Sequence, residues 1–424
     1  MKGISPLMLN KWSKDATKDI ALRSVWSQLS NRTDGVSAVS QAADFKVPDA
    51  VVHAVSKVHT KGDWSVTIPL LQSLVGDGVG GSKIATGTEE RPVALSSKTF
   101  YNNVRKTVTM GTQGVEFQSV QYLNMAKQRF DLVRDWFAMD DDYACQRAIC
   151  EGADRYLTEN QFWEDNEEIT TAPMSVALHP NIVFRGMTSS TAPVRNTTYA
   201  TDKANLVTAL ANMTASTVFD LATVDKIAMY AQGFISPLRW NAGNEVVNWI
   251  VLVSRIQADQ LRNDSAWNTL MQNAEVRGPD NRALSGILGT RHGLLLIEDP
   301  FSPIFHLSTN ESLPVGFEYV TPTQASTSTA MYGLGGLNRV VKGAATVATG
   351  TCEVARILGR GAIGMPEPES LTFKEALTDY EHRSGLCGSK MIGRVRLDFV
   401  NAAKTLTKNI SSGLFFTATP SIVY

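Results

Sequence analysis

The chain has 424 residues, with 40 Lys and Arg against 41 Asp and Glu, so its net charge is −1. This balance excludes a histone-type protein that binds nucleic acid through a strong basic excess. Charged residues make up only 19% of the chain, below the usual quarter, which suggests that further copies of the chain cover much of its surface, although a low-charge monomer is also consistent.

Residues 1–46 are predicted to form an arm rather than a domain. A helix is expected over residues 16–29, because Leu22, Val25 and Leu29 share one stripe. The arm holds too little apolar material to fold alone, so we expect it to reach under or across a neighbouring copy. The basic residues expected to make these contacts are Lys11, Lys14, Lys18 and Arg23.

Residues 62–112 are predicted to form a long hairpin. Apolar residues alternate from Trp64 to Leu70, and Pro69 within that run indicates an edge strand or a bulge. A glycine-rich tip follows, and the return strand is expected from about 93 to 110. Because an isolated hairpin is marginal in water, we expect this one to lie on another surface. The candidate contact residues are Trp64, Ile68, Leu70, Gly76, Gly78, Gly81, Lys83, Phe100, Tyr101 and Arg105.

The strongest helical pattern covers residues 120–151, where large apolar residues recur every three or four positions. A helix of that length spans nearly 50 Å and acts as a strut. Gly152 suits its end. Asp140, Asp141 and Asp142 lie near that end, where the helix dipole disfavours anions. They indicate either a basic partner, such as one on a neighbouring copy, or a solvated face, and the solvated face is the favoured interpretation.

The remainder of the chain alternates between strand and helix patterns. Residues 163–201 read as loops and an outer sheet with a strand at 182–184. A buried strand, two helices and a second buried strand place residues 246–300 in an α/β unit. Strands near the C-terminus are expected to return and close a sheet. The other expected elements are helices over 202–213, 220–232 and 344–358 and strands over 391–399 and 414–417.

The stretches that resemble nucleotide, metal or catalytic motifs lack the flanking elements or the spacing that such sites require. Two stretches satisfy GxGxxG, at Gly76–Gly81 and Gly359–Gly364, but neither is followed by a helical pattern, and the second is expected to follow a helix. The six histidines show no metal-ligand spacing, and no nucleophile elbow is present. We therefore predict no catalytic residue, no cofactor and no metal site.

The cysteines and the hydropathy pattern indicate the compartment. Cys145, Cys150, Cys352 and Cys387 form no CxxC pair, so buried reduced thiols are expected. No apolar run reaches the roughly 18 residues that span a membrane, and the N-terminus lacks the apolar stretch of a secretion signal. We expect synthesis in a reducing cytoplasm and no membrane partner.

The collinear order of arm, hairpin, strut helix, α/β unit and returning strands resembles the major capsid proteins of tailed phages, the Hong Kong 97 fold. It is most similar to the family typified by the coat protein of coliphage N-four. The stretches that carry this resemblance are Lys61–Leu70, Leu74–Val79, Asp131–Leu132 with Trp136, Glu151–Gly152, Ile250–Val253 through Trp267, and Leu284–Gly289 with the strand to Glu298.

The resemblance implies an α+β chain with five parts. These are an N-terminal arm (1–46), an E-loop hairpin with its flanking strand (47–116), a P-domain with the spine helix (117–205), an A-domain (206–369) and returning P-domain strands (370–424). It also implies a structural role without enzyme activity.

The function implied is a shell of hexamers and pentamers that encloses the double-stranded DNA of a tailed phage, made in the host bacterial cytoplasm and located in the virion. The implied partners are many copies of the chain, a portal protein, a separate scaffold or decoration protein, and DNA bound without base recognition. No N-terminal cleavage is expected. The alternatives are an encapsulin-like shell around protein cargo, and an enzyme that binds an anion near Gly359.

Overall fold

A computed structural model gives the architecture of the chain. It describes residues 6–23, 50–55, 65–71, 94–109, 125–154, 179–185, 199–213, 217–242, 245–274, 287–299, 302–306, 316–318, 351–378, 383–400 and 407–418, together with Trp26, Leu29, Gly80, Leu157 and Met187. Helices and strands are mixed along the chain, in agreement with the predicted α+β class.

The helices are α1 (Pro6–Arg23), α4 (Met125–Glu151), α7 (Tyr199–Ala211), α8 (Leu221–Phe234), α9 (Arg255–Asn263) and α10 (Ser265–Ala274). The strands are β1 (Val52–Val55), β2 (Ser65–Leu71), β3 (Ala94–Phe100), β4 (Asn102–Thr109), β5 (Ile182–Phe184), β6 (Trp240–Ala242), β7 (Glu245–Val247), β8 (Trp249–Val253), β9 (Ile287–Arg291), β10 (Leu294–Glu298), β11 (Ile304–His306), β12 (Gly316–Glu318), β13 (Thr351–Leu358), β14 (Ile363–Pro366), β15 (Glu369–Thr378), β16 (Arg383–Ile392), β17 (Val395–Arg396), β18 (Phe399–Val400), β19 (Thr407–Lys408) and β20 (Ser412–Ala418).

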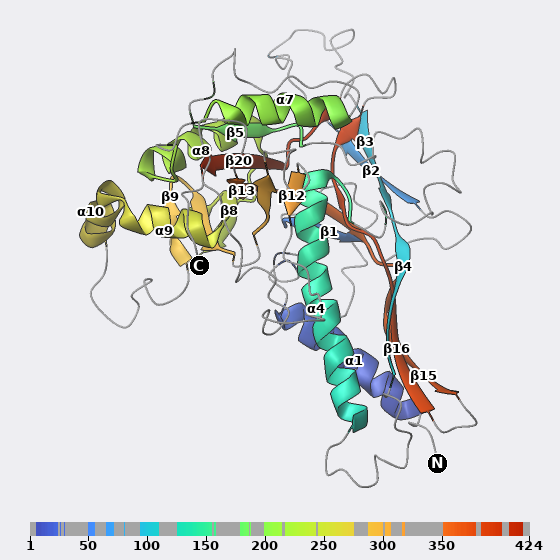
Figure 1. Cartoon of the computed structure of the whole chain (residues 1–424). Coiled ribbons are helices and arrows are strands. Elements are labelled where there is room, and N and C mark those ends of the chain that lie inside the picture. Colours follow the sequence, from blue (N-terminus) through green and yellow to red (C-terminus); the bar gives the residue numbers. More distant parts are fainter. Residues whose placement is uncertain are drawn as a thin grey trace.

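An eight-stranded sheet forms the wider part of the molecule (Figure 1). Its strands run β12-β11-β13-β8-β10-β9, with β20 beside β13 and β5 beside β20. β8 and β10 pair in parallel and are joined through α9 and α10, which confirms the predicted α/β unit. Alternate residues divide between two cores, so Val251 and Ile357 pack with α8 and α9, while Leu252 and Leu358 face the opposite side.

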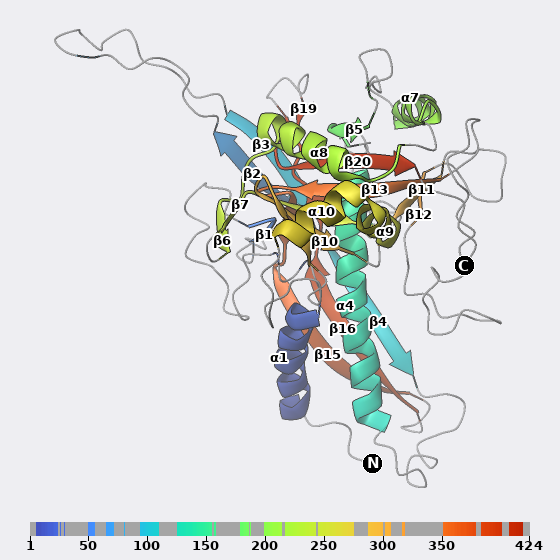
Figure 2. The same ribbon diagram turned by 90° about the vertical axis from the view of Figure 1, so that its left-hand side faces the viewer.

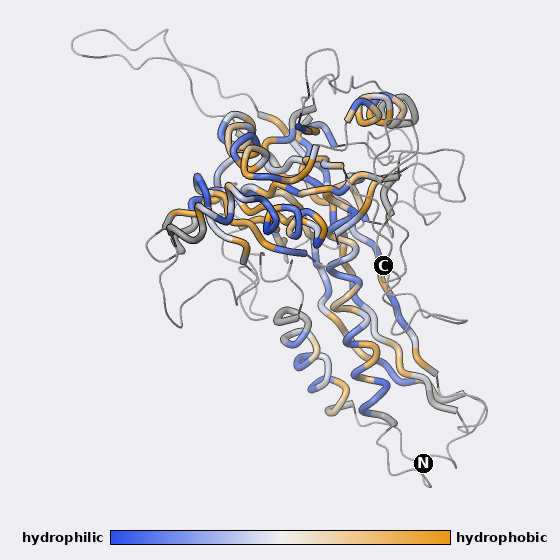
Figure 3. Tube along the Cα trace, turned by 60° about the vertical axis from the view of Figure 1, so that its left-hand side comes forward, coloured by the Kyte–Doolittle hydropathy of each residue, from blue (hydrophilic) through white to orange (hydrophobic). Residues whose placement is uncertain are grey.

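A second, elongated part extends away from this sheet (Figure 2). Here β4, β16 and β15 form a long antiparallel ribbon, and α4 runs along it. The helix has 27 residues and is therefore about 40 Å long. Hydrophilic and hydrophobic segments alternate along it (Figure 3), and its burial increases along its length, so that nearly every residue from Asp140 to Glu151 is buried.

Two glycines determine how α4 packs and where it ends. A Cβ added at Gly388 of β16 would lie 2.8 Å from side-chain atoms of both Val133 and Phe137. At the far end Gly152 adopts a φ of 101°, which favours glycine, so the predicted break is confirmed. The predicted start of this helix, at residues 119–124, lies outside the described residues.

The predicted hairpin exists, but its return strand divides. β2 pairs antiparallel with β3 and lies at the edge of its sheet, as Pro69 indicates. The chain then switches sheets at Tyr101, and β4 pairs with β16 instead. A single return strand over 93–110 is therefore wrong. The base of the hairpin also has a core of its own, formed by Ile68 and Leu95 with residues of the C-terminal segment, Leu397 and Phe399.

Two further expectations are corrected. Residues 351–358 form β13 and not a helix, because they pair with β20, β8 and β11 at the centre of the large sheet. The N-terminal helix begins at Pro6, before the expected start at residue 16; its continuous described part runs to Arg23, and Trp26 is also helical. The expected helices over 202–213 and 220–232 are confirmed as α7 and α8, and the strands over 182–184, 249–253, 293–297 and 414–417 as β5, β8, β10 and β20.

The sheets connect segments across the expected domain boundaries. β5 from the expected P-domain and β20 from the returning strands both join the sheet of β8 and β10. Conversely β14, expected in the A-domain, pairs with β1 and β17. The strands β16 and β18 return to the first quarter of the chain, where they pair with β4 and β3.

Candidate functional site

The predicted hairpin contacts fall into three groups. Trp64, Gly76, Gly78, Gly81 and Lys83 lie outside the described residues, and Leu70 lies on β2. Arg105 is exposed on β4. In contrast Ile68, Phe100 and Tyr101 are at most 7% exposed. Little of these three side chains is open to a neighbour within the single chain, and their role as contact residues stays a prediction.

The N-terminal helix also lies on its own chain. The Trp12 ring centroid is 5.0 Å from that of Phe130 on α4, and Phe130 is 5.1 Å from Phe373 on β15. Arg134 donates from Nη1 to Asp19 at 2.9 Å. The helix α1 therefore finds a surface on its own chain, and the predicted reach of the arm to a neighbouring copy stays a prediction.

The basic residues expected in the arm lie on the same helix. Lys11 and Lys14 are exposed on α1. Lys18 and Arg23 follow on the same helix. Docking of α1 through Trp12 therefore leaves the side chains of Lys11 and Lys14 open to solvent.

A buried ion-pair cluster braces α4 against the turn between β16 and β17. Arg394 pairs with Asp141 through Nη2 and with Asp154 through Nη1, the latter at 3.3 Å. Lys390 Nζ lies 3.4 Å from Asp141 and 3.8 Å from Glu367. All five side chains are at most 7% exposed, so in a low-dielectric interior each charge depends on its partners.

This cluster corrects the interpretation of the acidic triplet. Asp140 and Asp141 are 0% and 4% exposed, and Asp142 accepts a hydrogen bond from the Trp26 backbone at 3.4 Å. The solvated face is therefore wrong, and the basic partners are on the same chain. The available signal was the set of basic residues within the otherwise apolar stretch of β16 and β17, at Lys390, Arg394 and Arg396.

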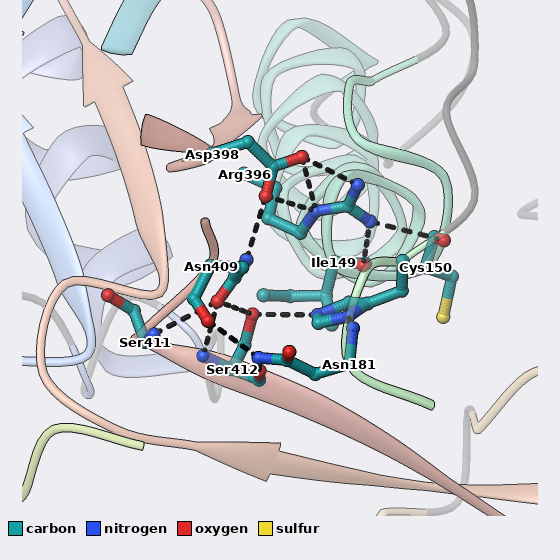
Figure 4. A network of polar contacts seen from close by, with 9 residues as sticks. Ile149, Cys150, Asn181, Arg396, Asp398, Asn409, Ser411 and Ser412 are labelled. Carbon is teal, nitrogen blue, oxygen red and sulfur yellow. Dashed lines mark hydrogen bonds and ion pairs between the residues drawn. The ribbon is translucent and has the colours of Figure 1, made fainter. Parts of the chain in front are cut away.

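A second polar network joins the C-terminal end of α4 to the large sheet (Figure 4). Arg396 donates to Asp398 and, through Nη1, to the Ile149 and Cys150 carbonyls at 3.0 and 3.4 Å. A cation at this position complements the helix dipole. Asn409 donates to Asp398 at 2.9 Å and thereby extends the network toward β20.

The network ends in a His–Ser pair that has the wrong geometry for catalysis. His179 Nε2 and Ser412 Oγ are 2.8 Å apart, but His179 Nδ1 accepts the backbone N–H of Asn181 at 2.9 Å. The ring proton therefore sits on Nε2 and faces the hydroxyl, so the imidazole donates to Ser412 and does not activate it. His179 and Ser412 are 3% and 0% exposed, which agrees with a structural role.

A third contact ties the middle of the large sheet to α4. Arg356 of β13 donates through Nη2 to Asp299 at 2.9 Å and to Ser302 at 3.0 Å. Gln146 of α4 donates to the same Asp299 oxygen at 3.2 Å. The long helix is thus fixed to both parts of the molecule by buried polar contacts, and it transmits any displacement between them.

The second glycine-rich stretch has a structural explanation. The stretch Gly359–Gly364 follows β13 and leads into β14, so it follows a strand and not the expected helix. A Cβ at Gly359 would lie 2.4 Å from the Ser236 carbonyl oxygen, which explains the glycine by packing. Within the described ranges no three His, Cys, Asp or Glu side chains are grouped to hold a metal ion, and no helix there is long and apolar enough to cross a membrane.

The cysteines are free thiols, and burial keeps two of them protonated. All four are free, and Cys145, Cys150 and Cys352 are buried, as predicted, whereas Cys387 is half-buried. Burial raises the pKa of Cys145, with further contributions from nearby Asp142 and Asp154. Burial also raises the pKa of Cys352, which keeps both thiols protonated near neutral pH.

The described part of the chain thus combines a long helix braced at three points, the β2–β3 base of the hairpin and a large sheet. Residues 41–416 match the family model described as phage capsid protein. The chain belongs to this family, which confirms the resemblance and makes the chain a major capsid protein. No curated protein sequence matches it.

Solved capsid structures share its fold at low sequence identity. The capsid of Ralstonia phage GP4 aligns with a TM-score of 0.58 at 15% identity, covering 88% of each chain. The capsid asymmetric unit of cyanophage Pam1 gives 0.58 at 15% identity, covering 94% of this chain and 93% of the other. The acidic stable capsid of Helicobacter pylori bacteriophage KHP30 gives 0.56 at 12%, covering 94% and 91%. The fold is therefore the Hong Kong 97 type.

Proposed function

We propose that copies of this chain form hexamers and pentamers that close into an icosahedral shell around the double-stranded DNA of a tailed phage. The family match carries this proposal. The chain acts as a structural protein without enzyme activity, is synthesised in the host bacterial cytoplasm and ends in the virion. A portal protein, and a separate scaffold or decoration protein, complete the assembly.

The hairpin is proposed to lie over an adjacent copy. Its base is rigid, because Ile68 and Leu95 pack against Leu397 and Phe399 of the same chain. β2 is the edge strand of its sheet, and Thr67 on it is exposed. Among the described residues β2 pairs with a strand on one side, so its other side is suited to contact a neighbouring surface. DNA contact is proposed to be weak and directed at phosphates, through exposed Lys11 and Lys14 of α1.

Shortening the hairpin tests this function. Leu71 and Ala94 are opposite each other in the β2–β3 register, so residues 72–93 can be replaced by the two-residue turn Asn-Gly. This design keeps Leu95 and the core of the hairpin base. We expect a folded, soluble subunit that forms no shells in electron micrographs, whereas the full chain forms them. Shells of normal size from the shortened chain contradict the role of the hairpin.

Cryo-microscopy of native particles then tests the content of the shell. Layers of DNA and a portal at one vertex support the virion. Ordered protein cargo without a portal supports an encapsulin-like compartment instead and contradicts the proposed genome shell.

A further inference from the structure

The outward side of α8 carries an apolar surface. Met229 is 75% exposed and Phe234 is 62% exposed, and the half-buried Tyr230 ring stacks on Phe234 with centroids 4.8 Å apart. From Ile227 to Leu238 the sequence contains no charged residue. We call Met229, Tyr230 and Phe234 the α8 patch. Exposed Met and aromatic side chains in an uncharged segment are typical of the centre of a protein interface.

The α8 patch is held rigidly from below. Asp220 caps the helix by accepting the Thr223 N–H at 2.9 Å. The inner side of α8 is packed into the core of the large sheet, with Val224, Ile227 and Ala231 each 0% exposed. The patch is therefore not a loosely packed part of that core, and its backbone is already ordered before a partner binds.

The neighbouring helix has a different surface. Arg255, Asp259 and Arg262 are exposed on α9, and Arg262 pairs with Glu298 at 2.6 Å. On the same face of the sheet, α9 thus has the charged surface expected toward water, whereas the end of α8 lacks charge. The charged residues of α8 lie one turn before the patch and are already bonded, since Lys226 Nζ donates to the Phe184 carbonyl at 3.0 Å and Asp225 accepts from Arg291 at 2.5 Å. The patch itself therefore offers no cation to the phosphates of DNA.

We infer that the α8 patch is a contact between neighbouring copies of this chain within one ring of the shell. This inference rests on the proposed function. The low charge of the whole chain indicated that copies cover its surface, and the patch is a rigid, uncharged place for such cover. Rings of five or six copies require a heterologous contact, so the patch of one copy meets a different surface on the next copy.

Substitution of the patch tests the inference. Met229→Asp with Phe234→Asp places two charges on exposed positions, so we expect unchanged circular dichroism and an at least tenfold lower yield of shells. The matched control is Ala222→Asp, at an exposed position on the first turn of α8, which we expect to assemble like the wild type. Normal shell yield from the double variant overturns the inference. If the wild type also forms no shells, the proposed function fails first.

A photo-crosslinking residue at position 234 gives a readout that does not depend on the folding of the charged variant. In assembled shells we expect a ladder of crosslinked chains longer than two, because heterologous contacts continue around a ring. Dimers alone, no crosslink, or a crosslink only to a different protein each overturn the inference.

Discussion

Replacing Arg394 by Met removes both ion pairs that this side chain makes, with Asp141 and Asp154. Arg394 is 1% exposed, and breaking a buried pair from one side costs about 3–5 kcal/mol because the remaining charges lose their compensation. The entropy of unfolding is about 2.1 cal/mol/K per residue, or roughly 0.9 kcal/mol/K for 424 residues. The expected fall in melting temperature is therefore about 3–6 °C.

Thermal melts followed by circular dichroism measure this effect, and the chain with the shortened hairpin allows them to be made without assembly. The matched control is Arg262→Met. Arg262 pairs with Glu298 at 2.6 Å, but its side chain is 49% exposed, so its loss costs at most about 1 kcal/mol. If Arg394→Met and Arg262→Met lower the melting temperature equally, the buried cluster does not brace α4 as argued.

Three further changes test other parts of the structure. Burial lowers the pKa of His53 to about 4, so the folded state keeps this ring neutral. The free energy of unfolding therefore falls by about 3 kcal/mol between pH 6.5 and 4, where the unfolded chain binds the proton and the folded chain does not. In a series of denaturant titrations across pH, His53→Gln removes this part of the pH dependence. A Cβ at Gly393 would lie 1.7 Å from the Phe100 carbonyl oxygen, so we expect Gly393→Ala to lower the free energy of unfolding in urea by more than about 3 kcal/mol. The control is Gly233→Ala, in open space on α8, which we expect to raise it by about 0.5–1 kcal/mol. Equal effects of the two substitutions contradict the close approach at Gly393. Trp12→Ala weakens the docking of α1 by about 2 kcal/mol, and limited proteolysis then cleaves α1 faster; unchanged cleavage shows that the aromatic contact does not hold it.

Elements with strong local signals were predictable. The run of apolar residues at 249–253 gave β8, and the parallel partner followed from the similar run at 294–297. Ser254 and Gln257 form a reciprocal capping box at the start of α9, and Asp220 caps α8. In each case the residues that decide the element lie within a few positions of it.

Elements decided by distant residues were not predictable in the same way. β13 is buried on both faces, so its sequence has no polar alternation and fits a helix as well as a strand. Arg356 in its middle adds a charge whose partner, Asp299, is far away in sequence. Asp141 of α4 similarly pairs with Lys390 and Arg394, about 250 residues later, and no local rule identifies such a pair.

The candidate contact residues of the hairpin and of α8 also depend on distant parts of the chain. Alternation showed which hairpin residues share a face, but whether that face is covered by the same chain depends on Leu397 and Phe399. Ile68 is predicted from the sequence as a contact with a neighbouring copy, because the sequence does not show that these two distant residues cover it. The α8 patch was not predicted, because Met229 and Phe234 are apolar and their sequence is typical of core residues. Only the structure shows that other residues of α8 fill the contact with the sheet and leave these two exposed.

The switch of the chain between two sheets at Tyr101 has a mechanical consequence. One residue separates the hairpin strand β3 from the ribbon strand β4, and that residue is 3% exposed, with the Phe100 carbonyl beside it pressed against Gly393. A joint so short and so enclosed has little room to absorb rotation. Under the proposed contact with a neighbouring copy, we expect a pull on the hairpin to turn the ribbon with it and so to change the tilt of each copy's α4.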